Sequence, residues 1–241
     1  MSESNDHLVL IAGKSATGKS ASLMNIKNPE GVMYCNCEGK KLPFKSKFKE
    51  FLITDPYQIY QGFDHAETDP KIHTIIIDTL TYMMDMFETI HIVGAANSMQ
   101  QWGAYAQFWK KLMSQYVAKS TKNVIFLGHT MDVMNEAEMI NETLVKVKGS
   151  IMNQGVESAF STVISSKKVP IKKLKDSDNP MLTITPEEEA LGFKYCYQVR
   201  LTKDTVNERM RGSLGMWQTS ETFIDNNVQH VIDRLHDYYD E

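Results

Sequence analysis

The segment from Gly13 to Ser20, Gly-Lys-Ser-Ala-Thr-Gly-Lys-Ser, has the residue types and spacing of a loop that binds phosphate. Glycines at its two ends let backbone N–H groups turn toward an anion, and a following helix adds its positive N-terminal end. The lysine and the serine that close the segment supply a cation for the β- and γ-phosphates and a ligand for Mg²⁺. The nucleotide-binding residues expected from this pattern are Gly13, Lys14, Ser15, Ala16, Thr17, Gly18, Lys19, Ser20 and Ala21.

Three further polar residues each follow an apolar run that predicts a buried strand: Glu38, Asp78 and His129. Ligand-facing residues of an open α/β sheet collect at the carboxyl ends of its strands, so these side chains are expected to share one site. Asp78 would hold the Mg²⁺ that Ser20 ligates. Glu38 would orient the attacking water, and His129 would sense the γ-phosphate through a hydrogen bond. An ordinary polar strand end and a structural histidine remain the alternatives for Glu38 and His129.

The elements that must position these residues alternate between apolar strands and helices, which predicts a parallel sheet covered on both faces. From about residue 160 strands follow one another with little helix between them, which predicts antiparallel members. We therefore expect an α/β fold in one domain, 1–241, with a mainly parallel central sheet flanked by helices and antiparallel strands toward the C-terminus. The expected strands are 8–12, 32–37, 51–53, 75–77, 124–127, 160–164, 195–201 and 214–217. The expected helices are 19–26, one starting at Asp55-Pro56, 82–90, 104–118 and 221–238, with a surface loop or hairpin at about 172–192.

Composition limits the classes of partner and compartment. The net charge of −4 gives the molecule no overall basic field, so any contact with a polyanion must be local. The N-terminus lacks a signal segment and no apolar run approaches membrane-spanning length, so we expect a cytoplasmic protein without membrane contact. Cys35 and Cys37 are expected on one face of a strand as free thiols, because a closed metal site needs further ligands.

The order of these parts resembles the RecA-like P-loop ATPases, most closely the small phage proteins of that superfamily that act as single-strand annealing recombinases. The segment 13–20 matches their Walker A loop, Glu38 their catalytic glutamate, and 75–79 their Walker B strand. His129 occupies the position of a polar switch residue, which is a glutamine in RecA itself. The resemblance implies a RecA-like fold, ATP and Mg²⁺ as cofactors, and ATP hydrolysis.

The same resemblance implies a homo-oligomer, a ring or a filament, with ATP between subunits. Arg209 and Arg211 resemble the family's pair of basic residues, two apart on a late strand, that reach the neighbouring subunit's γ-phosphate, a task that suits a planar guanidinium. A solvated arginine pair is the alternative. The segments 93–103 and 130–155 match the family's first and second DNA loops.

Contact with DNA has several candidate sites. The second loop carries acidic residues that repel phosphate, with lysines only toward its end. Two lysine clusters are alternatives, because cations interleaved with aromatic rings suit single-stranded DNA, although a solvated charged face explains them as well. The first cluster is Lys40, Lys41, Lys45, Lys47 and Lys49 with Phe44 and Phe48, and the second is Lys167, Lys168, Lys172, Lys173 and Lys175. Trp102 is a candidate for stacking on a base or for packing. Lys14 is interpreted as a solvated side chain, with a trans-acting lysine, as in the ParA/MinD type of P-loop, as the alternative.

Together these observations predict an oligomeric, Mg²⁺-dependent ATPase that binds single-stranded DNA and promotes annealing or strand exchange in phage recombination. A single-strand binding protein is a candidate partner, and the bacterial host cytoplasm is the expected compartment. One alternative is a slow or non-catalytic ATP-dependent loader of a replication partner. Another is a small P-loop phosphotransferase, although the sequence has no compact arginine-rich lid segment.

Overall fold

A single mixed sheet organises the computed structural model, which describes residues 4–174 and 178–240. Within these residues nine strands are joined in the order β3-β2-β4-β5-β1-β7-β8-β9, with β6 paired to β5 outside this path. Their bounds are β1 Leu8–Gly13, β2 Val32–Asn36, β3 Lys49–Leu52, β4 Thr74–Asp78, β5 Asn123–Asn135, β6 Ile140–Val145, β7 Thr162–Pro170, β8 Phe193–Gln198 and β9 Phe223–Asp225.

The directions of the strands confirm the predicted fold class. The neighbours from β3 across to β7 run parallel, whereas β7, β8 and β9 pair antiparallel. The central strands β1, β2 and β4 are buried along their whole length, as expected for a sheet covered on both faces.

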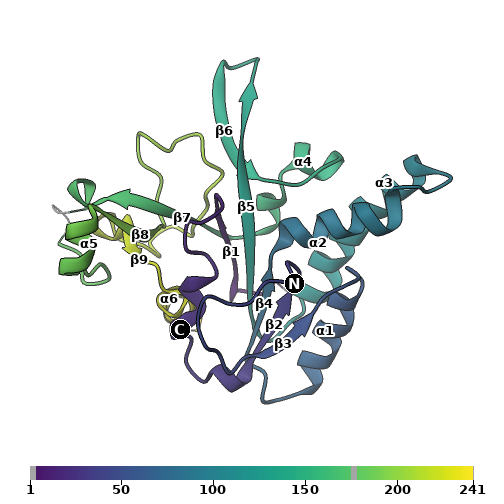
Figure 1. Cartoon of the computed structure of the whole chain (residues 1–241), viewed down its shortest axis with the longest axis horizontal. Helices are drawn as coiled ribbons and strands as arrows, with labels where there is room; N and C mark the ends of the chain where they lie inside the picture. Colours follow the sequence, from purple (N-terminus) through teal and green to yellow (C-terminus); the bar gives the residue numbers. More distant parts are fainter. Residues whose placement is uncertain (1–3, 175–177, 241) are drawn as a thin grey trace.

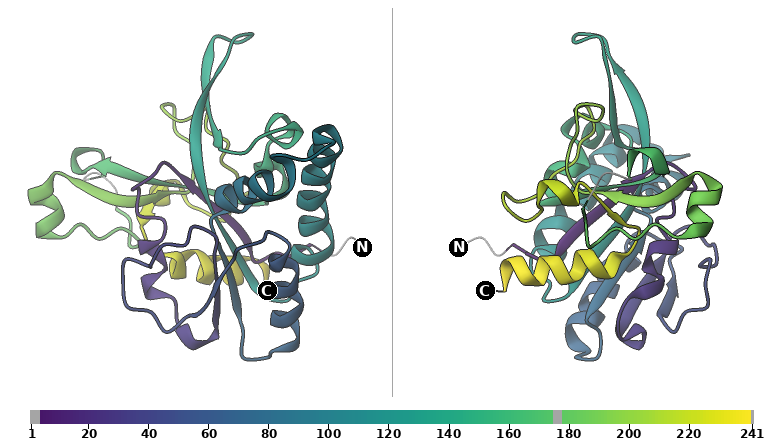
Figure 2. Two further views of the ribbon diagram at one scale, coloured as in Figure 1. Left: turned by 45° about the vertical axis from the view of Figure 1, so that its right-hand side comes forward. Right: turned by 90° about the vertical axis from the view of Figure 1, so that its left-hand side faces the viewer.

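Helices cover the two faces of the sheet, α1, α2 and α3 on one side and α6 on the other (Figures 1 and 2). The sheet therefore has two core layers, one under α1–α3 and one under α6. Successive residues of β1 point to opposite faces, so Leu10 belongs to the first layer and Ile11 to the second. The helices are α1 Gln58–Thr68, α2 Leu80–Phe87, α3 Ser98–Lys111, α4 Ser150–Gln154, α5 Pro186–Leu191 and α6 Val228–Tyr239. In the part of the chain that the structure describes, none of the helices combines the length and apolar character that a membrane crossing requires.

The helix-like segment predicted at 19–26 is present as a short 3₁₀ helix, η1 (Ala21–Asn25), which follows the phosphate loop. Pro29 explains the short length. A residue before proline avoids the α conformation, and Asn28 takes a left-handed one with φ of 49°. Too few residues then remain between the loop and Asn28 for several α-helical turns.

Both predicted DNA loops are largely regular structure. Residues 130–145 form most of a hairpin, since β5 continues to Asn135 and pairs antiparallel with β6, and this hairpin projects from the sheet (Figure 1). In the first predicted loop, 93–103, α3 begins at Ser98. Asn97 caps that helix by accepting a hydrogen bond from the Gln100 N–H. Only residues 93–97 remain outside a helix.

The C-terminal third departs from prediction at three places. Residues 214–217 form a turn instead of a strand, with Leu214 95% exposed and Trp217 buried. Residues 209–211 are not in a strand, because this part of the chain makes only isolated bridges, from Glu208 to Thr143 of β6 and from Arg211 to Val163 of β7. The predicted surface loop at 172–192 contains α5, whose start is fixed by a capping box between Thr185 and Glu188.

The two free cysteines of the C-x-C pattern meet their expectation. Cys35 lies in β2 and Cys37 follows it, and both are buried, unbridged and part of the core under α1–α3. They therefore share one face of the sheet. Cys196 of β8 is also a free, buried cysteine.

Gly13 is required where β1 enters the phosphate loop, because an added Cβ would lie 2.5 Å from the Ser166 backbone oxygen and 2.8 Å from Thr17 Oγ1. Gly13→Ala is expected to lower the free energy of unfolding by about 1–3 kcal/mol through overpacking. Gly103→Ala is the matched control, since no atom lies within 4 Å of a Cβ at that exposed position of α3. It should raise stability by up to about 1 kcal/mol. Urea denaturation of both variants tests this, and an equal effect at the two sites would contradict it.

Candidate nucleotide-binding site

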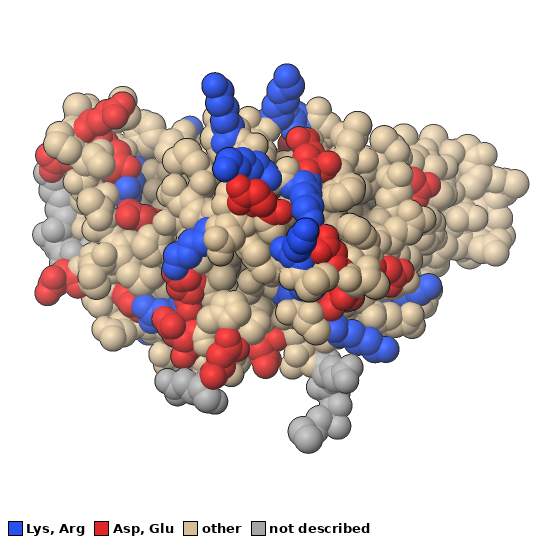
Figure 3. Space-filling view, turned by 90° about the horizontal axis from the view of Figure 1, so that it is seen from below, with Lys and Arg blue, Asp and Glu red and all other residues tan. Residues whose placement is uncertain are grey.

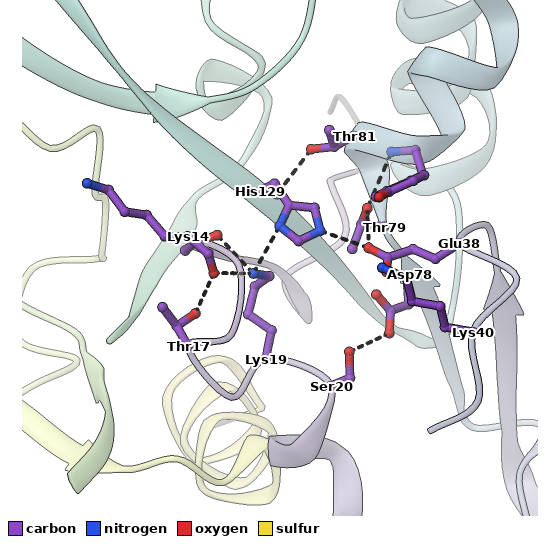
Figure 4. Close-up of polar contacts among 12 residues, drawn as sticks. Lys14, Thr17, Lys19, Ser20, Glu38, Lys40, Asp78, Thr79, Thr81 and His129 are labelled. Atoms are coloured by element: carbon purple, nitrogen blue, oxygen red, sulfur yellow. Dashed lines mark hydrogen bonds and ion pairs between the residues drawn. The ribbon is translucent and has the colours of Figure 1, made fainter. Parts of the chain in front are cut away.

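The phosphate loop wraps around the buried side chain of Lys19, which is 6% exposed. Its ammonium donates to the Gly13 carbonyl at 2.8 Å and to the Lys14 carbonyl at 2.9 Å (Figure 4). Gly18 supports the turn with a φ of 93°. Burial lowers the pKa of Lys19 to about 8, although the charges of Asp78 and Glu38 oppose the shift. Because burial disfavours the charged form of Lys19, an anion bound in the loop would stabilise its ammonium.

Ser20 and Asp78, the pair predicted to hold Mg²⁺, lie in contact. The Ser20 hydroxyl donates to Asp78 Oδ2 at 2.8 Å, and the Tyr34 hydroxyl donates to the same oxygen at 2.8 Å. The second oxygen, Asp78 Oδ1, is buried and accepts no hydrogen bond from any described residue. Burial raises the pKa of the Asp78 carboxyl, although the hydrogen bonds from Tyr34 and Ser20 act to lower it. A serine hydroxyl beside a carboxylate with a free oxygen fits the oxygen ligands that Mg²⁺ prefers.

Glu38 and His129 form a second pair, which connects the segment after β2 to the middle of β5, where His129 lies opposite Gly13 at the end of β1. His129 Nε2 lies 2.8 Å from Glu38 Oε1, and Lys40 Nζ lies 3.1 Å from Oε2 (Figure 4). Burial alone would raise the pKa of the Glu38 carboxyl, but the hydrogen bonds from His129 and Lys40 lower it to about 2. Glu38 is therefore an ionised acceptor at neutral pH.

His129 also faces the phosphate loop, because its Nδ1 lies 3.4 Å from Lys19 Nζ. A proton on Nε2 lets the ring donate to Glu38 while Nδ1 accepts from Lys19. The backbone N–H of His129 donates to Thr81 Oγ1 at 3.0 Å, which ties β5 to the start of α2. The loop lysine, the histidine and the glutamate thus form one continuous polar chain.

A cavity of about 410 Å³ lies beside this chain and is lined by Lys19, Ser20, Glu38, Asp78 and His129. The strand-end residues predicted from the sequence are therefore brought together at one site. The cavity wall also includes residues that the sequence did not single out, Tyr34, Thr79, Tyr195 and Asn226.

Tyr195 and Asn226 come from the antiparallel, C-terminal part of the chain. Asn226 Nδ2 donates to the Gly18 carbonyl at 2.9 Å, and the Tyr195 ring lies close to the same glycine. No motif connects these residues to the phosphate loop, so only the fold brings them there. The sequence offers one signal for Tyr34. It lies within a strand that is predicted to be buried, and a buried tyrosine hydroxyl needs a hydrogen-bond partner.

Lys14 is exposed but not simply solvated. Its ammonium lies 2.7 Å from Asp132 Oδ2 on the projecting part of β5, and Thr143 of β6 donates to Asp132 Oδ1 at 2.8 Å. Beside this ion pair lies a second cavity of about 380 Å³, which is lined by the phosphate loop, by the hairpin and by Lys167 and Lys168. The phosphate loop is therefore linked to the hairpin by an ion pair.

Arg209 and Arg211 lie away from the Lys19 cavity and do not line it. The Arg209 guanidinium lies 3.0 Å from Glu142 of β6 and 3.9 Å from the buried carboxylate of Glu157. The Arg211 backbone pairs with Val163, and its side chain is exposed. Their predicted role concerns the site of a neighbouring subunit, so it stays a prediction.

The two lysine clusters are partly neutralised by carboxylates. Lys40, Lys47 and Lys49 pair with Glu38, Glu30 and Asp69, and Lys167 and Lys173 pair with Glu208 and Asp204. Lys168 lies over the rings of Phe193 and Tyr195, whereas Lys175 lies outside the described residues. On the face shown in Figure 3, blue and red side chains are intermixed. Trp102 packs edge-on against Tyr105 and is partly buried, which favours the packing alternative.

Comparisons with known proteins add a distant structural likeness. A scan against protein-family models finds no match, and a search of curated proteins finds no similar sequence. Among solved structures, a KaiC-like protein from the hyperthermophilic archaeon Pyrococcus horikoshii is similar to this chain, with 10% sequence identity and a TM-score of 0.47. The match covers 91% of this chain and 88% of that protein. It assigns neither a family nor an activity, so the functional argument rests on the site.

The low pKa of Glu38 predicts a pH-dependent stability. A carboxyl whose folded-state pKa is depressed stabilises the fold fully above its unfolded pKa and loses that contribution as pH falls toward 2. The free-energy difference between the parent and Glu38→Gln should therefore shrink as pH falls from about 4.5 toward 2. Chemical denaturation between pH 2.5 and 6 measures it. Glu136→Gln, on the exposed hairpin turn, is the control and should follow the parent; a Glu38→Gln profile parallel to the parent's would contradict the assignment.

Proposed function

We propose that this chain is a Mg²⁺-dependent ATPase of the RecA-like type, with ATP bound in the cavity beside Lys19. One observation carries the proposal: the loop lysine, the Ser20–Asp78 pair and the Glu38–His129 pair line the same cavity. This is the set of groups that phosphoryl transfer needs, namely a phosphate cradle, ligands for a metal and a group that orients water. ATP as the nucleotide is taken from the resemblance of the motifs.

Each residue has a separate task in this proposal. Lys19 exchanges its contacts with two loop carbonyls for the phosphate oxygens, which compensates the cost of its burial. Ser20 and Asp78 hold Mg²⁺, which neutralises charge on the phosphates. Asn226 fixes the Gly18 carbonyl and with it the loop turn.

Glu38 would orient the attacking water by accepting a hydrogen bond from it. It would not remove the proton of that water in the ground state. A carboxylate with a pKa of about 2 is a weak base, because general-base catalysis is most efficient near the operating pH. Release of the His129 hydrogen bond would raise this pKa and make Glu38 more basic. His129 therefore acts as a switch between the phosphate loop and the glutamate.

The finer proposal is that ATP binding changes the affinity for single-stranded DNA and so promotes annealing or strand exchange in phage recombination. Two connections support the coupling. β5 is one continuous strand from His129 to the hairpin, and the Lys14–Asp132 ion pair joins the phosphate loop to that hairpin. Assembly into a ring or filament would bring Arg209 and Arg211 to a neighbouring subunit's ATP.

A second candidate function is an ATP-dependent loader of a protein partner. The hairpin favours it, because Met134 and Met139 are 50% and 75% exposed near its tip, among acidic residues. A surface of apolar and acidic side chains suits a protein better than a nucleic acid. The two candidates differ in whether DNA stimulates the ATPase.

The ATPase itself is tested by phosphate release from ATP with Mg²⁺. Lys19→Ala should abolish nucleotide binding and turnover, because it removes the cation that faces the phosphates. Glu38→Gln should keep ATP binding and slow turnover by about 10²- to 10⁴-fold. Lys110→Ala, an exposed lysine of α3, is the control and should behave as the parent. Hydrolysis by Lys19→Ala at the parent's rate would refute the assignment.

Coupling to DNA is tested at the Lys14–Asp132 pair. Asp132→Asn removes the charge but retains an oxygen that accepts from Thr143. We expect this variant to lose several-fold in the stimulation of phosphate release by single-stranded DNA, with basal turnover retained. Glu138→Gln, an exposed residue of the same hairpin, is the matched control. Stimulation that survives in Asp132→Asn would exclude this route, and a parent indifferent to DNA would favour the loader.

A further inference from the structure

A cluster of metal-ligating side chains lies at the opposite end of β1 from the phosphate loop. His7 directly precedes β1, whereas His236 and Asp240 come from the last turn of α6 and the residue after it. His7 Nε2 lies 2.9 Å from Asp240 Oδ1, and His236 Nδ1 lies 2.5 Å from Asp240 Oδ2. One ligand atom from each residue falls within 4.8 Å of the others. The three side chains converge on one small volume.

The orientation of His236 is fixed by Asn123, the first residue of β5. Asn123 Nδ2 donates to the His73 carbonyl at 3.2 Å and lies 3.3 Å from Thr74 Oγ1, so its oxygen faces His236. His236 Nε2 lies 2.8 Å from that oxygen and must carry the hydrogen. Nδ1 then lies 2.5 Å from Asp240 Oδ2, a contact that holds a hydrogen between the two atoms, and a bound metal ion would take the place of that hydrogen. Proteins orient metal-binding histidines in this way: one ring nitrogen donates a hydrogen bond to an outer partner, and the other ring nitrogen faces the metal.

His7 completes the set from a different part of the chain. Its ring stacks on that of His236, with centroids 4.0 Å apart and planes inclined by 30°. The His7 backbone N–H donates to Asn5 Oδ1 at 2.9 Å, which fixes the segment before β1. The side chains of His7 and His236 are 20% and 40% exposed, so an ion can enter from solvent.

From this arrangement we infer a binding site for a divalent transition metal of the zinc class, held by His7 Nε2, His236 Nδ1 and an Asp240 carboxylate oxygen. Two imidazole nitrogens and one carboxylate with an open side are a ligand set that Zn²⁺ accepts in proteins, and Co²⁺ and Ni²⁺ bind similar donors. Magnesium prefers oxygen ligands, so this site differs in chemistry from the Ser20–Asp78 pair. The bound ion would fasten the segment before β1 to the end of α6.

Titration of the full chain with Co²⁺ tests the site, because Co²⁺ bound to nitrogen and oxygen ligands gives a visible absorption band that Zn²⁺ abolishes on displacing it. We expect one saturable equivalent in the parent. His7→Ala and His236→Ala should each weaken binding at least 10-fold. Asn123→Ala should weaken it by about 10- to 100-fold as a positioning residue, with circular dichroism to check folding.

Two controls separate this site from other metal binding. His230→Ala removes another histidine of α6 and should retain the band. Asp78→Asn disables the proposed magnesium pair and should also retain it, so failure of the nucleotide proposal does not affect the outcome. Zn²⁺ should raise the melting temperature of the parent but not of His7→Ala or His236→Ala. Absence of a saturable band in the parent, or an equal band in His236→Ala, would overturn the inference.

Discussion

The parallel alignment of β2, β4, β5 and β1 determines where the chemistry of this protein lies. Parallel strands in register end at the same edge, so the residues that follow them meet there although they are far apart in the sequence. Asp78 ends β4, whereas His129 lies within β5 opposite Gly13, where β1 enters the phosphate loop. This register places both residues in the wall of the cavity that Lys19 lines. The two core layers under α1–α3 and under α6 hold the strands in place, and a shift in strand register would separate the lysine from both carboxylates.

Charge balance at this edge explains why the groups are arranged in pairs. The buried ammonium of Lys19, the buried carboxylate of Asp78 and the partly buried carboxylate of Glu38 would each be costly alone, and together they offset one another's desolvation. His129 is the adjustable member, because it contacts both Lys19 and Glu38. A phosphate that takes the lysine would change the partner of Nδ1 and, through the ring, the hydrogen bond to Glu38. Contacts therefore run from the phosphate loop through His129 to Glu38, and β5 continues from His129 into the hairpin.

The sequence predicted the strands that carry the site, because apolar runs followed by single polar residues are a strong local signal. It missed features that depend on distant contacts. Tyr195 and Asn226 reach the phosphate loop only through the antiparallel strands. The exposed half of the β5–β6 hairpin lacks the continuous apolar run that predicts a strand, so the sequence indicates only a loop there. The sequence predicts a helix-like segment after the phosphate loop but does not indicate its 3₁₀ form. Arg209 pairs with Glu142 within the chain, a contact that no motif indicates.

The central claim is that Lys19, Ser20 and Asp78 together bind ATP with Mg²⁺, and calorimetric titration of ATP tests it most directly. The parent and Asp78→Asn would each be titrated with Mg²⁺ and with a chelator in its place. The account predicts that Mg²⁺ tightens ATP binding to the parent and that Asp78→Asn loses most of this gain. Equal ATP affinity in all four titrations, or no binding by the parent, would contradict it.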